Sequence, residues 1–200
     1  MSIQNTHLAD AHGDPGLARA GLRLARLAAD VARHEPSPRL HALIALREAA
    51  AHALLGDAGA FRIAINQARR ELDRGSHPAD PPWCDFVIEP EITGHEAHGQ
   101  LSLGRANRSI TLYESVLDGD QLTPRNRICW EAGLAAALLD AGDRAQALVQ
   151  GHVIVPALAM GQITSSRPLA RLRNVRLAAE EVGDEEFCLL YDTARRMPAG

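Results

Sequence analysis

The sequence predicts an all-α protein in which about five antiparallel helix pairs stack into a solenoid. Three observations lead to this fold class. Long stretches are rich in Ala, Leu and Arg, which lose little conformational freedom on entering a helix. Residues that favour strands are sparse and never alternate with polar residues over a useful length. A short turn of Gly followed by Asp or Arg recurs after apolar helical stretches.

The recurring turn marks the point where one helix of a pair should end and the next begin. Its glycines are 38 to 48 residues apart. Gly enters the left-handed conformation that closes a helix, and the following Asp can cap the next helix. The residue five positions after each glycine is small in four of five cases, which would let paired helices approach closely. The turns are Gly13-Asp14, Gly56-Asp57, Gly104-Arg105, Gly142-Asp143 and Gly183-Asp184, and the residues at the fifth position are Ala18, Phe61, Ser109, Ala147 and Cys188.

These turns and the Pro-containing segments between pairs divide the chain into helices, with the whole chain, 1–200, as one domain. The longest Pro-containing segment, 75–82, is the candidate hinge. Pro90 falls inside one predicted helix, so that helix either starts there or is kinked there, and a kinked or broken helix is favoured. The predicted pairs are 2–12 with 16–34, 38–55 with 58–74, 84–103 with 105–118, 124–141 with 144–160, and 166–182 with 184–197.

Composition and charge exclude several classes of function. The net charge is −4 and the basic residues are scattered, so direct contact with nucleic acid is not expected. The N-terminus has no apolar core of a signal peptide, and no apolar run is long enough to cross a bilayer, which predicts a cytoplasmic protein. Cys84, Cys129 and Cys188 are an odd number and far apart, which argues against a disulfide framework or a zinc ribbon.

The sharpest candidate for chemistry is a cluster of Glu91, His95 and His98. On a helix these three residues share a face, and their side chains are of the types that bind divalent metals. The spacing is not that of the metalloprotease HExxH motif, because the second His comes one residue early. A polar, solvated helix face is the favoured interpretation. The sequence therefore predicts no metal and no cofactor, and a metal-dependent enzyme remains the least favoured alternative.

The aromatic and cysteine side chains are expected to serve packing. Trp83 and Phe86 could form an aromatic lip over a groove, but core anchors are favoured in so Ala-rich a chain. A nucleophilic Cys84 would need His95 against its thiol and a third orienting group, and nothing in the sequence indicates either. No enzyme is predicted. The other residues expected to pack are Tyr113, Cys129, Trp130 and Cys188.

Four segments resemble the tetratricopeptide-like regulatory region of actinobacterial transcriptional regulators that carry an XRE-type helix-turn-helix. They are LHALIALREAAAHALLGD at 40–57, PPWCDFVIEPEITGHEAHGQLSLG at 81–104, PRNRICWEAGLAAALLDAGD at 124–143 and FCLLYDTARRM at 187–197. No helix-turn-helix is found in this sequence, so none of the family's DNA-binding residues has a counterpart here. The resemblance implies a tetratricopeptide-like fold and a regulatory role without catalysis.

In tetratricopeptide arrays the first helix of each pair lines a concave groove. Projected onto this sequence, the groove is acidic, with a basic patch near its C-terminal pair, and it could hold a peptide, a protein helix or a small molecule. A solvated groove wall is the plain alternative. A free-standing scaffold or dimerisation module is the alternative function, and a homodimer is compatible with the sequence. The groove residues are Glu91, Gly94, His98, Cys129, Asp140 and Arg173, and the basic patch is Arg167, Arg171, Arg173 and Arg176.

Overall fold

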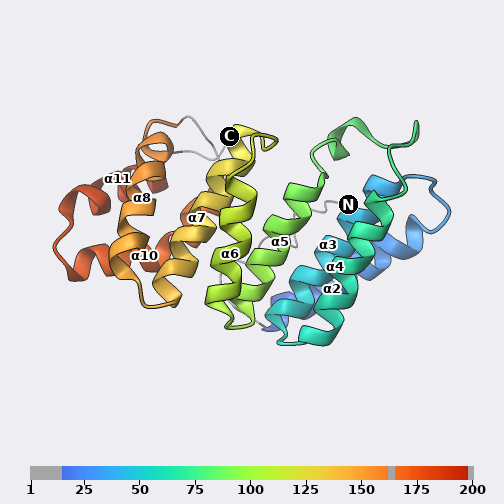
Figure 1. Ribbon diagram of the computed structural model, residues 1–200, viewed down its shortest axis with the longest axis horizontal. Helices are drawn as coiled ribbons and strands as arrows, with labels where there is room; N and C mark the ends of the chain where they lie inside the picture. The colour runs from blue at the N-terminus through green and yellow to red at the C-terminus, as the bar shows by residue number, and fades with distance from the viewer. Residues whose placement is uncertain (1–14, 162–164, 198–200) are drawn as a thin grey trace. The chain divides into compact units, whose positions relative to one another are not determined.

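The computed structural model describes residues 15–161 and 165–197, and all regular secondary structure within these ranges is helical. The chain divides into two compact units, Met1–Arg105 and Ala106–Gly200 (Figure 1). The predicted helix at 2–12 and the first turn, Gly13-Asp14, lie outside the described residues. The all-helical prediction is confirmed for the described part of the chain, whereas a single domain hinged at 75–82 stays a prediction.

The first unit is arranged around one helix. Its helices are α2 (Pro15–Val31), α3 (Pro38–Leu54), α4 (Ala58–Leu72) and α5 (Glu89–Ser102), with the 3₁₀ turn η2 (Pro82–Cys84) before α5. The N-cap Ser37 accepts a hydrogen bond from Leu40 N at 3.2 Å, and Pro38 follows at the position where a missing N–H costs nothing. α3 contacts α2, α4 and α5, which explains why its sequence is apolar on nearly every side.

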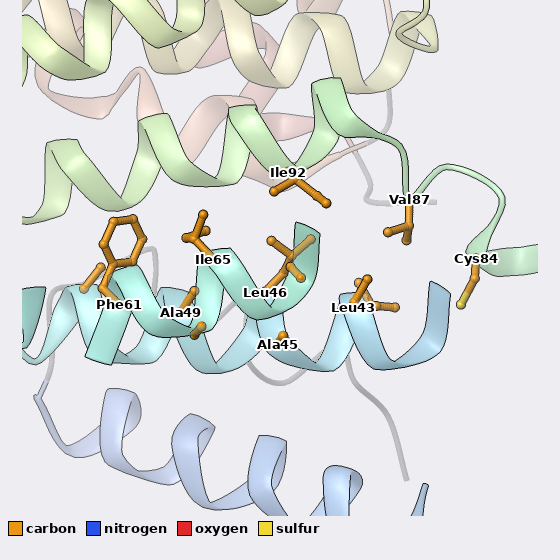
Figure 2. Close-up of a cluster of buried hydrophobic side chains, with 13 residues drawn as sticks. Leu43, Ala45, Leu46, Ala49, Phe61, Ile65, Cys84, Val87 and Ile92 are labelled. Atoms are coloured by element: carbon orange, nitrogen blue, oxygen red, sulfur yellow. The ribbon is translucent and has the colours of Figure 1, made fainter. Parts of the chain in front are cut away.

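Side chains from α3, α4 and α5 meet in the core of this unit (Figure 2). Leu46 of α3, Ile65 of α4 and Ile92 of α5 are all nearly inaccessible to solvent. Phe61 lies at one end of the cluster, where its ring occupies the space that a side chain at Gly99 of α5 would need. A Cβ atom at Gly99 would be 2.2 Å from Cε2 of Phe61, so glycine is what allows α5 to approach α4 here.

The second unit is centred on α7 (Pro124–Asp140), which contacts helices on several sides. The other helices are α6 (Ala106–Leu117), α8 (Arg144–Ala159), α9 (Ser166–Arg171), α10 (Arg173–Glu181) and α11 (Glu185–Arg196). α7 packs against α6, α8, α9 and α10, and α11 packs mainly against α8. Close contact again depends on glycine, because Tyr113 fills the space beside Gly133 and Phe187 fills the space beside Gly151.

The predicted turns are confirmed wherever the structure describes them. Gly56, Gly104, Gly142 and Gly183 have φ angles of 75°, 73°, 89° and 75°, in the left-handed region. The Asp residues that follow three of these glycines cap the next helix, because Asp57, Asp143 and Asp184 accept hydrogen bonds from the N–H groups of residues 60, 146 and 187. Two further glycines of this kind follow α4 and α8 and were not predicted as turns; they are Gly75 and Gly161.

Three local predictions were wrong. The helix predicted at 84–103 begins only at Glu89, with Pro90 in its first turn, so it starts at this proline instead of being kinked there. The helix predicted at 166–182 is broken at Leu172, whose side chain is fully buried and which no Gly or Pro marks in the sequence. Trp83 was expected in the core but is 56% exposed, because the 3₁₀ turn directs Cys84 inward instead.

The other expected packing residues are placed as predicted, with one exception. Tyr113, Cys129 and Trp130 are buried, and the rings of Tyr113 and Trp130 lie with their centroids 6.1 Å apart. Cys188 is only half-buried, so it lines the edge of the core. Phe86 is half-buried and packs against the core of the first unit.

Candidate interaction surface

The acidic start of α5 is tied to α4 through one arginine. Arg69 lies 2.8 Å from Glu89 and 2.9 Å from Glu96, and it also donates a hydrogen bond to Oγ1 of Thr93 at 3.3 Å. Partial burial acts to lower the pKa of Arg69, but the hydrogen bonds and charges of the two glutamates raise it. Glu89 and Glu96 therefore hold α5 against α4 through Arg69.

The Glu91, His95 and His98 cluster is largely internal. Glu91 and His95 are buried, with Nε2 of His95 3.7 Å from Oε1 of Glu91, and His98 is half-buried. Among the described residues, no group of three or more His, Cys, Asp or Glu side chains is placed to hold a metal ion. The favoured interpretation of a polar, solvated helix face is wrong for Glu91 and His95, because both side chains are buried by the packing of α5 against its neighbours.

The segment at 75–82 is joined to the start of α3 through Asp80. One carboxylate oxygen accepts hydrogen bonds from Oγ of Ser37 at 2.6 Å and from N of Arg39 at 3.2 Å, and the other accepts from N of His77 at 2.8 Å. Desolvation acts to raise the pKa of Asp80, but the hydrogen bonds from Ser37, His77 and Arg39 lower it. These bonds fix the local conformation of the predicted hinge segment.

Cys84 follows this segment and lacks the properties of a nucleophile. Its side chain is fully buried, and desolvation, followed by the charge of Asp80, raises its thiol pKa to about 11. The thiolate form, which would be the reactive one, is therefore scarce at neutral pH. Cys84 packs into the hydrophobic cluster of the first unit beside Leu43 and Val87 (Figure 2).

Half of the predicted basic patch in the second unit holds helices together. Arg171 of α9 donates to the backbone oxygen of Cys129 at 2.7 Å and lies 4.6 Å from the ring centroid of Trp130. Arg176 of α10 pairs with Glu180 and with Asp192 of α11. Arg167 is half-buried, and Arg173 is exposed at the first position of α10.

The six predicted groove residues differ in their access to a partner. Glu91, Gly94 and Cys129 are buried, and His98 is half-buried. Asp140, at the end of α7, and Arg173, at the start of α10, are exposed. Within the second unit, therefore, the exposed members of the set are a carboxylate and a guanidinium on two first helices.

A second surface, which sequence reasoning missed, lies on α8. Its outer face exposes Val149, Val153 and Met160 by 60%, 64% and 65%. The equivalent second helices α4, α6 and α11 turn mostly polar residues outward, such as Arg62, Thr111 and Glu186, and expose at most one large apolar side chain each, Ile63 on α4 and Leu189 on α11. The signal was present in the sequence, because residues 144–160 are mostly apolar and contain no acidic residue.

Comparison with known proteins supports the fold and gives no family. No family model matches the chain, and no curated protein matches it. Two solved structures resemble it, both of a Podosopora anserina protein described as a kinesin light chain with nearly identical TPR-like repeats, one of them carrying a single substitution. The first is 15% identical to this chain, with a TM-score of 0.51, and the match covers 96% of this chain and 93% of that one. The second, which carries the substitution, is 16% identical, with a TM-score of 0.53, and the match covers 96% of this chain and 92% of that one. This likeness shows a TPR-like, that is tetratricopeptide-like, fold.

Over the described ranges, 15–161 and 165–197, no helix is both long enough and apolar enough to cross a membrane.

Proposed function

We propose that this chain is a non-catalytic interaction domain that binds a protein or peptide partner along the first helices of its pairs. The observation that carries the proposal is the TPR-like fold, which the similarity to solved structures extends over 96% of the chain. Repeated helix pairs present a continuous surface to a partner, and proteins of this architecture use it for binding. The buried or half-buried residues Glu91, Gly94 and His98 would shape this surface in the first unit, and Cys129 would do so in the second.

The contacts in the second unit would come from Asp140 and Arg173. Both are exposed and of opposite charge, so they would orient a partner that carries complementary charges. Such exposed charges contribute mainly to the rate and specificity of binding. The chain would act in the cytoplasm.

We also propose that binding of this partner regulates transcription. Support comes from the resemblance of four segments, including 40–57 and 124–143, to the regulatory region of XRE-type regulators. In such proteins, binding to the repeat region would bias the state of a DNA-binding domain. A free-standing scaffold is the second candidate, and it shares the surface but not the link to transcription.

Quantitative affinity capture from cells tests the binding surface. The chain and a variant with Asp140→Arg and Arg173→Glu would be compared with Glu114→Arg, which changes an exposed charge on the second helix α6. The expected result is a partner retained by the chain and the control but reduced at least about tenfold with the double variant. Equal recovery with all three proteins would refute the assigned surface.

Chromatin immunoprecipitation of the tagged, full-length gene product tests the link to transcription. Enrichment at defined promoters is expected for a regulator. If no promoter were enriched above background while the partner was still captured, the link to transcription would be wrong and the scaffold function would be favoured.

A further inference from the structure

The outer face of α8 is an apolar row along the length of the helix. Successive members of the row are four, four, three and four residues apart, so they share one side of a helix. Three of them are more than half exposed, Ala145 is exposed and Pro156 is half-buried. We call this surface the α8 row; its members are Ala145, Val149, Val153 and Pro156 of α8 and Met160, the C-cap of this helix.

The row does not contribute to the core of its own unit. The core side of α8 carries Ile154, Val155 and Leu158, which pack in the cluster that α7, α10 and α11 complete. Another side of α8 is also occupied, because Nε2 of His152 lies 2.7 Å from Asp184 and its ring meets Phe187 edge-on at 5.2 Å. The α8 row therefore remains exposed after the core contacts of the helix are made.

The geometry of the row suits another helix. Ala145, Val149 and Val153 form a ridge with the i+4 spacing that interdigitates with a similar ridge in the commonest class of helix packing. Valine side chains are stiff at χ1 and lose little entropy when they are buried. Polar groups border the row, as expected for the rim of an interface: Gln146, Gln150 and the ion pair between Arg144 and Glu181 at 2.9 Å.

We propose that the chain self-associates through the α8 row, which packs against the same row of a second copy about a two-fold axis. The absence of charge within the row argues for this occupant. In a two-fold contact each patch meets itself, so a charged patch would bring like charges together. Each copy also carries a net charge of −4, which opposes association through most of its surface. The α8 row contains no ionisable side chain, so two copies of it can meet without repulsion between like charges.

This contact is independent of the proposed binding surface, because it uses a second helix. The first helices, with Asp140 and Arg173, take no part in it. A chain that dimerises but captures no partner would support this inference and contradict the proposed function. A chain that captures a partner but stays monomeric would support the proposed function and contradict this inference.

Sedimentation equilibrium of the full chain tests the proposal. We expect a mass twice the 21.5 kDa of one chain at concentrations on the order of 100 µM. Val153→Glu should raise the dimer dissociation constant at least about 100-fold, since the two-fold axis buries the new charge twice. Ile63→Glu is the matched control, because Ile63 is 65% exposed on α4 among polar neighbours, and this variant should dimerise unchanged.

A second variant tests the symmetry of the contact. Val153 lies near the middle of the row, so Val153→Cys should form a disulfide between two copies under mild oxidation, whereas Ile63→Cys should not. Circular dichroism should show that all four variants remain helical. A monomeric chain at all concentrations, or a dimer that Val153→Glu leaves intact, would overturn the proposal, and the monomer would assign the row to a helix of another protein.

Discussion

α4 and α8 hold the same position in their helix pairs but turn different faces to water. Each follows a glycine of positive φ and an Asp N-cap, and each is followed by another such glycine. Outward, α4 presents Arg62, Asn66 and Arg70 with one apolar residue, Ile63, whereas α8 presents the α8 row. The comparison teaches that turns and inner faces are dictated by the shared architecture, while an outer face is free to vary and so can carry function.

The inner faces should therefore respond alike to substitution, with the largest effects on stability. Gly99→Ala would place a Cβ atom 2.2 Å from Cε2 of Phe61, which projects from α4, and Gly151→Ala in α8 would place one 2.6 Å from Cε2 of Phe187. Each change should lower the free energy of unfolding by about 1–3 kcal/mol, because the buried rings cannot move without straining the core. Urea denaturation followed by circular dichroism measures this effect.

A glycine on the open side of α4 provides the control. At Gly59 an added Cβ atom would meet only Oδ1 of Asp57, at an ordinary 3.5 Å. Gly59→Ala should keep or raise stability by up to about 1 kcal/mol, since Ala favours helix over Gly. If Gly99→Ala were as well tolerated as Gly59→Ala, the close approach of α4 and α5 would be wrong.

A pH-dependent difference should follow from the contact between α8 and α11. Desolvation acts to raise the pKa of Asp184, but its hydrogen bonds with His152 and with N of Phe187 lower it. A carboxyl whose pKa is lowered on folding stabilises the protein above its unfolded pKa of about 4, and this contribution is lost as pH falls through the folded value. Asp184→Asn should thus cost about 1 kcal/mol at pH 7 and progressively less below pH of about 4.

This dependence is measured by urea denaturation of both proteins across the acidic range. Asp57→Asn provides the comparison with α4, because Oδ1 of Asp57 accepts a hydrogen bond from Ala60 N at 2.9 Å. A constant difference between the original chain and Asp184→Asn from pH 7 to pH of about 2 would contradict the role of the ionised carboxylate.

The N-caps of α4 and α8 should contribute equally to stability, and each should contribute less than the buried glycines. Asp57 accepts from Ala60 N at 2.9 Å and Asp143 accepts from Gln146 N at 3.0 Å, so both satisfy one N–H group at a helix start. Replacement of either by Ala should cost about 1 kcal/mol of unfolding free energy. Thermal unfolding of the two variants side by side checks this equality, and an effect confined to one cap would break it.

Much of the fold could be predicted from local sequence signals. Gly56, Gly142 and Gly183 mark turns because only Gly enters their conformation freely, and each is followed by a capping Asp. The break at Leu172 could not be predicted in this way, since it depends on a side chain buried by tertiary packing. Trp83 was misplaced for the same kind of reason, because a 3₁₀ turn after Pro81 decides which neighbour enters the core.

The candidate sites were less predictable than the fold. Helical projection placed Glu91 and Cys129 on a groove wall, but a first helix that packs on several sides buries most of its positions. The projection also could not show that Arg171 and Arg176 are used within the unit, because their partners come from other helices. The α8 row, in contrast, could have been found, because the segment 144–160 carries more apolar residues than one buried helix face requires and contains no acidic residue.

Side-chain oxidation by hydroxyl radicals most directly tests the claim that α8 presents a contact surface while α4 presents a solvated face. Met160 in the α8 row and Trp83 in the first unit are reactive residues that are both more than half exposed, at 65% and 56%. Mass spectrometry at low and high protein concentration should show Met160 becoming protected as the chain associates, while Trp83 and Ile63 of α4 continue to react at the same rate. If the oxidation rate of Met160, like that of Trp83, did not change with protein concentration, the claim would be contradicted.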